Sequence, residues 1–146
     1  GAKSILDLNK TYELLETLGI TRIGFKTDYM PGFWYSETKH KVDNNFEKVS
    51  DISNYLKLNS KLNRNKSILI FNKVPEINAI SRDQINEWIS RAIVRAEKNK
   101  ISGKALTPFL INKINNFSNN KTLKANVSLI INNADLAGKI AKNFYS

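Results

Sequence analysis

The chain has 146 residues, of which 41% are hydrophobic and 25% charged, and it carries a formal net charge of +10 without any cysteine. This length and composition are typical of one globular domain, and the lack of cysteine excludes disulfides, thiolate zinc sites and cysteine nucleophiles. No apolar run approaches the roughly 18 residues that a transmembrane helix needs, so we expect no membrane span.

The basic charge makes nucleic acid a candidate partner. The lysines, however, are spread along the whole chain and form neither a dense block nor a stripe alternating with aromatic residues. Lysine and asparagine are abundant together, which indicates a codon bias toward A and T. We therefore expect no nucleic-acid partner, and a basic nucleic-acid-binding module is kept as an alternative.

The N-terminal stretch places Lys3 between two small residues, Gly1 and Ala2, and the apolar pair Ile5 and Leu6. Small neighbours leave room for a ligand to approach the amine. If the apolar pair is buried, desolvation lowers the pKa of Lys3 and makes it a usable nucleophile. A solvated terminal lysine is the simpler alternative. Because the chain begins at Gly1 without an initiator Met, we expect a piece of a longer or processed protein.

A helix followed by a strand is predicted in the first part of the chain. Apolar residues at helical spacing predict a helix over residues 10–18, which Gly19 can close in a left-handed conformation. Residues 21–27 are rich in β-formers and predict a strand. The aromatic loop at 28–34 is expected to pack against the core, because it has bulk to bury.

Residues 36–41 are polar and predict a mobile segment, in which His40, the only histidine, is expected to be solvated and without a role. A second helix is predicted over residues 45–58, followed by a polar surface loop. The apolar run at 67–72 predicts a strand buried on both faces, as in an α/β sheet. Asn72 ends this strand, where α/β folds place their sites, and a turn cap is the equal alternative.

Three helices are predicted in the C-terminal half. Ser81 begins a capping box and a helix that ends near residues 98–100. Thr107 is predicted as the N-cap of the next helix, which residues 118–120 break. The last helix covers residues 122–145. Its predicted core face is Val127, Ile130, Ile131, Ala134, Ala137, Gly138, Ala141 and Phe144. The chain contains no phosphate-binding glycine loop, Ser-His-Asp set or carboxylate cluster, so we expect no metal site within it.

Short motifs near both ends of the chain occur in an order that is specific when they are taken together. The N-terminal motifs are Gly1-Ala2-Lys3-Ser4-Ile5-Leu6-Asp7-Leu8, Leu15-Glu16-Thr17-Leu18-Gly19, Gly24-Phe25-Lys26-Thr27-Asp28 and Pro31-Gly32-Phe33. The C-terminal motifs are Ile101-Ser102-Gly103-Lys104, Thr107-Pro108-Phe109-Leu110, Leu123-Lys124-Ala125-Asn126-Val127 and Asn132-Asn133-Ala134. This set resembles the pseudouridine-5'-phosphate glycosidase family, also called indigoidine synthase A-like. The resemblance implies a three-layer α/β/α fold, of which residues 1–146 are the C-terminal half of a single domain.

The resemblance implies an enzyme that reversibly cleaves pseudouridine 5'-phosphate to uracil and ribose 5-phosphate. The family's lysine nucleophile falls on Lys3, whose amine attacks the anomeric carbon, opens the ring and forms an imine before the C–C bond breaks. An asparagine of the family's substrate site falls on Asn126. Its amide offers both a donor and an acceptor, which suits a pyrimidine edge, and a helix-start hydrogen bond is the alternative.

Other parts of the family's site are implied to lie in the missing N-terminal half, which would be a partner of this chain. They are an acidic proton donor, an aspartate ligand for a divalent metal such as manganese, and a further lysine. We therefore expect the chain to be inactive alone. The resemblance also implies that the complete protein is a cytoplasmic homotrimer. Lys73 replaces a proline of the family pattern, and residues 118–120 replace a Thr-Gly-Gly turn. A catalytically inactive homologue with a structural or binding role is the alternative.

Overall fold

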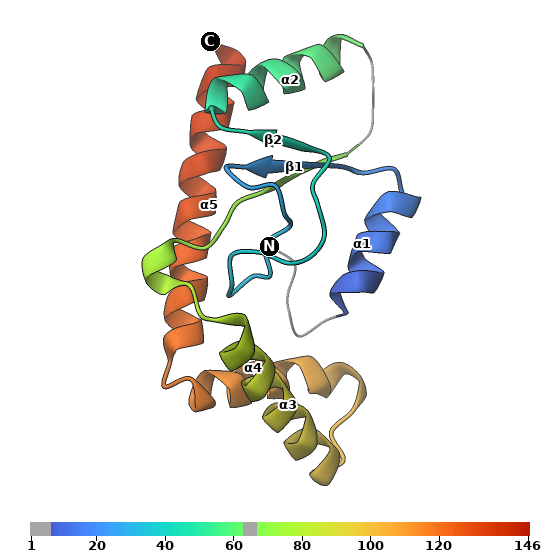
Figure 1. Cartoon of the computed structure of the whole chain (residues 1–146), viewed down its shortest axis with the longest axis vertical. Coiled ribbons are helices and arrows are strands. Elements are labelled where there is room, and N and C mark those ends of the chain that lie inside the picture. The colour runs from blue at the N-terminus through green and yellow to red at the C-terminus, as the bar shows by residue number, and fades with distance from the viewer. Residues whose placement is uncertain (1–6, 63–66) are drawn as a thin grey trace.

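A small parallel sheet lies at one end of the molecule, and helices extend from it to the other end (Figure 1). The computed structural model describes residues 7–62 and 67–146. In chain order the elements are α1 (Leu8–Thr17), β1 (Thr21–Phe25), β2 (Asn44–Phe46), α2 (Val49–Lys61), β3 (Ile68–Phe71), the 3-10 turn η1 (Glu76–Asn78), α3 (Arg82–Lys98), the 3-10 turn η2 (Gly103–Ala105), α4 (Leu106–Phe117) and α5 (Lys121–Tyr145).

The described strands form a sheet in the order β2-β1-β3, and both pairings are parallel. In β1, Ile23 is paired with Asn44 on one side and with Ile70 on the other. Parallel strands need a crossover connection, and α2 supplies it between β2 and β3. The predicted α/β class is therefore confirmed.

Helices lie against both faces of the central strand. Successive side chains of a strand point to opposite faces. Ile23 is fully buried in a cluster with Ile52 of α2 and with Leu136 and Ile140 of α5. On the opposite face, the guanidinium of Arg22 lies 4.3 Å from the ring centre of Tyr12 in α1. One face of β1 thus packs on α2 and α5 through Ile23, and Arg22 on the other face contacts α1.

A second buried cluster joins the aromatic loop to the three C-terminal helices. Its buried members are Trp34, Tyr35, Val74, Ile80, Ile85, Trp88, Ala92, Ala96, Leu110, Ile114, Ala125 and Leu129. The 25-residue helix α5 runs along the length of the molecule, from α3 and α4 to the sheet (Figure 1). Ala125 and Leu129 of α5 belong to the second cluster and its Leu136 and Ile140 to the first, so α5 connects the two clusters.

Several helix ends agree with the local signals in the sequence. Gly19 follows α1 with φ 61°, a left-handed conformation that costs glycine little. The Ser81 hydroxyl accepts from the Gln84 N–H at 3.4 Å and begins α3. Asn119 and Asn120 have φ of 48° and 63° and end α4 before α5 begins. Asparagine tolerates this conformation better than most residues.

The predicted helix over 45–58 is wrong at its start. Residues 44–46 form β2 and are paired with residues 23–25, and α2 covers Val49–Lys61 instead. Pairing with β1 overrides the helical spacing that included Phe46, because the strand forms its hydrogen bonds with a distant segment. The strand predicted at 67–72 is confirmed, but it is not buried on both faces: Leu69 is 37% exposed, since β3 lies at an edge of the sheet.

Two predictions for the C-terminal helices are also wrong. Thr107 is not an N-cap, because α4 already begins at Leu106 directly after η2. Pro108 is tolerated there because the first-turn N–H groups have no partner within the helix. The predicted core face of α5 is largely exposed, with Ile130 at 68% and Ile131 at 64%. The residues of α5 that are buried are Thr122, Ala125, Leu129, Leu136 and Ile140.

Residues 36–41 are held by backbone bonds, contrary to the expectation of a mobile segment. The Thr38 N–H donates to the Met30 carbonyl at 2.9 Å, and the Met30 N–H donates to the His40 carbonyl at 2.8 Å. The His40 ring stacks on Tyr12 with 4.5 Å between centroids, and its Nε2 lies 3.0 Å from Asn9 Oδ1. Burial lowers the pKa of His40, with a smaller contribution from neighbouring Lys39. His40 therefore packs this segment onto α1.

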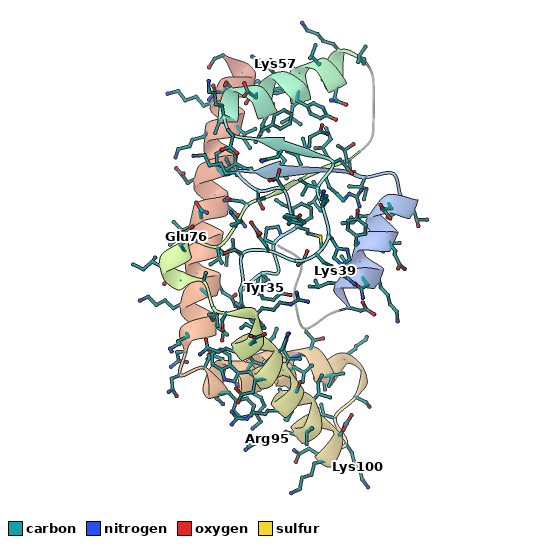
Figure 2. The ribbon with its side chains drawn as sticks, viewed as in Figure 1. Tyr35, Lys39, Lys57, Glu76, Arg95 and Lys100 are labelled. Atoms are coloured by element: carbon teal, nitrogen blue, oxygen red, sulfur yellow. The ribbon has the colours of Figure 1, made fainter. Side chains whose placement is uncertain are left out.

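Of the labelled basic side chains, Lys57 lies at the top of the molecule, Lys39 in the middle, and Arg95 and Lys100 together at the lower end (Figure 2). This spread agrees with the even distribution of lysine along the sequence. In the described part of the chain, none of the helices combines the length and the apolar character that a membrane crossing needs.

Candidate active site

A pocket of about 450 Å³ lies where the aromatic loop meets the helices α4 and α5. Its walls are Trp34, Thr107, Pro108, Ile111, Asn112, Asn115, Thr122, Leu123 and Asn126. Thr107 and Pro108 come from one of the C-terminal sequence motifs, and Leu123 and Asn126 come from another. Apolar walls with a few polar groups are typical of sites for small organic molecules. Two motifs that are separate in sequence therefore form one pocket.

Asn126 lies in the second turn of α5 and is partly exposed to this pocket. Its Oδ1 accepts a hydrogen bond from the indole Nε1–H of Trp34 at 2.6 Å. The alternative of a helix-start hydrogen bond does not apply, because α5 begins at Lys121 and its N-cap is Asn120. The amide of Asn126 is thus anchored by a residue from a distant loop.

The far wall of the pocket is held by a local network of amides and hydroxyls. The Asn115 Nδ2 donates to Asn120 Oδ1 at 2.8 Å, and the Thr122 hydroxyl donates to Asn115 Oδ1 at 3.4 Å. The buried hydroxyls of Ser118 and Thr122 lie 3.0 Å apart. Because Asn115 uses both ends of its amide inside the protein, it stabilises the turn between α4 and α5.

The described walls of the pocket carry no ionisable side chain. They can bind and orient a neutral ring, but they cannot exchange a proton with it. Next to the pocket, burial raises the pKa of Tyr35, although Arg82 opposes the shift, so this phenol stays neutral at neutral pH. Acid–base or nucleophilic chemistry here needs groups from elsewhere. Lys3, the predicted nucleophile, lies outside the described residues.

No three histidine, aspartate or glutamate side chains converge to hold a metal ion within residues 7–62 and 67–146. The described residues therefore offer no donor set that fits the divalent metal implied by the resemblance.

Asn72 has a structural role at the end of β3. Its Nδ2 donates to the Asn132 carbonyl at 3.3 Å, and Asn132 Nδ2 donates to the Lys73 carbonyl at 3.0 Å. These two bonds connect the end of β3 to α5. Asn72 also lines a different cavity of about 610 Å³ between the sheet and the end of α5, whose walls are mostly apolar. The structure does not bring Asn72 and Asn126 into one pocket.

Comparison with known proteins identifies the same family as the sequence motifs that form the pocket. The model of the family described as Indigoidine synthase A like protein matches residues 1–143. The chain belongs to this family. Curated relatives include the pseudouridine-5'-phosphate glycosidases of Kosmotoga olearia, 43% identical over 97% of this chain, and of Caldanaerobacter subterraneus, 44% identical over 97%. These matches cover 49% and 46% of the two relatives, so the chain spans about half the length of the curated relatives it matches.

Two solved structures share this fold. The prealnumycin C-glycosynthase AlnA, solved in complex with ribulose 5-phosphate, has a TM-score of 0.90 and 26% identity, covering 99% of this chain and 47% of AlnA. An indigoidine synthase A-like protein from Thermotoga maritima has a TM-score of 0.82 and 34% identity, covering 95% of this chain and 46% of its own.

Sequence reasoning pointed to Asn126 but missed Trp34, its hydrogen-bond partner. The two residues are 92 positions apart in the chain, so no local pattern joins them. A signal was present nevertheless: a tryptophan in a loop that packs into the core needs a partner for its indole N–H.

Proposed function

We propose that this chain is the half of a pseudouridine-5'-phosphate glycosidase that carries the lysine nucleophile, Lys3, and the pyrimidine-binding amide, Asn126. The observation that carries the proposal is the pocket shared by Thr107, Pro108, Leu123 and Asn126. Relatives that are 43% and 44% identical bear that name, and AlnA was solved with a pentulose phosphate.

A C-glycoside is difficult to hydrolyse directly, because its C–C bond has no heteroatom leaving group. In the proposed reaction the Lys3 amine bonds to C1' of the ribose as the C1'–O4' bond breaks, and the proton that the amine loses is balanced by the proton that O4' gains. The bond from C1' to the pyrimidine then breaks, and its electron pair leaves with the ring, which takes up a proton at C5. The imine that remains between C1' and Lys3 is hydrolysed by water, which releases ribose 5-phosphate and restores the amine. The net reaction consumes one water.

Asn126 acts in this proposal by holding the pyrimidine ring against the apolar wall of the pocket. The proton donor, the further lysine and the divalent metal, which we expect to be manganese, are assigned to residues outside this chain. A homotrimer is the assembly that we expect for the complete enzyme. The lack of ionisable groups in the described pocket walls supports this division, since the pocket supplies binding without acid–base chemistry.

The test uses the natural protein, incubated with pseudouridine 5'-phosphate while uracil release is followed by chromatography. A second measurement adds ribose 5-phosphate and borohydride, which reduces an imine to a stable amine, and locates the adduct by mass spectrometry. Lys3→Ala should abolish both the release and the adduct. Lys10→Ala is the matched control, because the Lys10 side chain is 83% exposed on the neighbouring helix, and it should retain both.

A folded natural protein that neither releases uracil nor forms an adduct would contradict the proposal and favour an inactive homologue. Release of uracil without an adduct on Lys3 would retain the reaction but refute the assigned nucleophile.

A further inference from the structure

We propose that Trp34 is a positioning residue, which fixes the amide of Asn126 so that its N–H groups face the pocket and donate to a carbonyl oxygen of the pyrimidine. This inference rests on the proposed function for the identity of the ligand. The orientation of the amide itself rests on the Trp34–Asn126 contact.

The chemistry of the indole decides which end of the amide it can meet. The indole nitrogen is a donor only, so its partner 2.6 Å away must be the amide oxygen of Asn126. Trp34 is 2% exposed, and an unpaired N–H at a buried site is costly. The reversed amide would place two donors against each other and is excluded. The Nδ2 hydrogens of Asn126 are therefore left for the pocket.

The position of Trp34 is itself well determined. The Ile80 N–H donates to the Trp34 carbonyl at 2.9 Å, and the Trp34 N–H donates to the Gly32 carbonyl at 2.9 Å. The preceding residue, Phe33, has φ 73°, which is unfavourable for a bulky side chain. Such a conformation persists only where the surrounding structure enforces it. The Phe33 ring also packs against the indole with 5.3 Å between centroids, so the loop holds Trp34 in a single place.

A fixed donor makes the pocket selective. Sequence reasoning assigned Asn126 both a donor and an acceptor toward a pyrimidine edge. The contact with Trp34 uses one lone pair of the oxygen and fixes the orientation of the amide. In this orientation the two N–H groups face the pocket, and the natural partner of an N–H group is a carbonyl oxygen. A ring that presents an amino group at that position would place donor against donor, so the site favours uracil's carbonyl groups over an amino-substituted ring.

Activity measurements on the natural protein compare Trp34→Phe with Trp88→Phe. Trp88 belongs to the same buried cluster and is 8% exposed, but it does not line the pocket, which makes it a matched control. Loss of one orienting hydrogen bond should lower kcat/KM about tenfold in Trp34→Phe. The loss should be divided between kcat and KM in the same proportion as in Asn126→Ala. Trp88→Phe should keep kcat/KM within about twofold of the wild type. In a variant that already carries Asn126→Ala, adding Trp34→Phe should not lower kcat/KM further.

The indole N–H resonances give a readout that needs no turnover, and the signal that is lost in Trp34→Phe is the Trp34 signal. The Trp34 signal should move upfield in Asn126→Ala and stay in Asn126→Asp, which keeps an acceptor but removes the donors and should also lower kcat/KM. The inference would be overturned if the Trp34 signal did not move in Asn126→Ala. It would also be overturned if Trp34→Phe lowered kcat/KM by about tenfold in a protein that already carries Asn126→Ala. Lack of uracil release by the wild type would refute the proposed function, and the indole signal would still decide whether Trp34 orients Asn126.

Discussion

The ion pair between Arg22 and Asp43 should stabilise the protein far more than the pair between Lys139 and Asp135, although each pair has a shortest N–O distance of 2.6 Å. The difference is burial: the Arg22 side chain is 8% exposed and the Lys139 side chain 61%. We therefore compare Asp43→Asn with Asp135→Asn, which remove the same charge from two pairs of equal length.

Asp43 accepts most of the side-chain hydrogen bonds that Arg22 donates. Its Oδ2 accepts from the Arg22 backbone N–H at 2.7 Å and from Nε at 3.2 Å, while Oδ1 accepts from Nη2 at 2.6 Å. Nη1 is buried and, among the described residues, has no hydrogen-bond partner, although it lies 3.4 Å from a Glu16 carboxylate oxygen. Removing the Asp43 charge therefore leaves a buried guanidinium poorly compensated.

Breaking a fully buried pair costs about 3–5 kcal/mol. Asp43 is 36% exposed, so water replaces part of the lost interaction and we expect a loss of about 2 kcal/mol in the free energy of unfolding. Asp135→Asn should cost less than about 0.5 kcal/mol, as is usual for exposed pairs four residues apart on a helix.

The effect of Asp43→Asn should depend on pH in a defined direction. The hydrogen bonds from Arg22 lower the pKa of Asp43 below its value in the unfolded chain, and burial opposes this only in part. A carboxyl group whose pKa is lower in the folded than in the unfolded protein stabilises the folded state. This contribution is fully present above the pKa of the unfolded chain, about 4, and is lost as the pH falls through the pKa of the folded protein. The difference between Asp43→Asn and wild type should therefore shrink below about pH 4.

Urea unfolding followed by circular dichroism measures both effects, at neutral pH and at about pH 3. Equal losses from Asp43→Asn and Asp135→Asn at neutral pH would refute the argument from burial. A gap between Asp43→Asn and wild type that stays constant down to low pH would refute the assignment of the acid-dependent stability to Asp43.

Three further substitutions test a close backbone contact, a hydrogen bond between helices and the turn between α4 and α5. Gly24→Ala should destabilise the protein by about 2 kcal/mol or more, since a Cβ there would overlap the Thr27 carbonyl oxygen, and a normal melting temperature would contradict this. Ser53→Ala should cost about 1 kcal/mol, because the 1% exposed hydroxyl donates to the Ile140 carbonyl at 3.1 Å and links α2 to α5; unchanged urea unfolding would count against that link. Asn119 has φ 48°, a left-handed conformation that alanine tolerates poorly and glycine well. Asn119→Ala should therefore lower the free energy of unfolding by about 1 kcal/mol, whereas Asn119→Gly should not destabilise the protein. Equal melting temperatures of the two variants would refute this explanation of the turn.

Helix ends could be predicted from the sequence because their causes are local. The Ser81 side chain contacts the N–H of Gln84 three positions later, and Gly19 adopts a left-handed conformation directly after α1. The family motifs likewise pointed to Asn126 before any geometry was known. The helix ends depend on residues within a few positions of each other, whereas Asn126 was identified from the order of motifs along the whole chain.

Contacts between distant segments were decided by the tertiary structure alone. β2 forms because Asn44–Phe46 is paired with β1, and α5 buries Leu136 and Ile140 while Ile130 and Ile131 remain exposed, although either set could have formed a core face by spacing. The partner of Asn126 is Trp34, 92 residues away. A sequence records which groups need a hydrogen-bond partner or a buried face, but only the folded chain selects among the many that are chemically suitable.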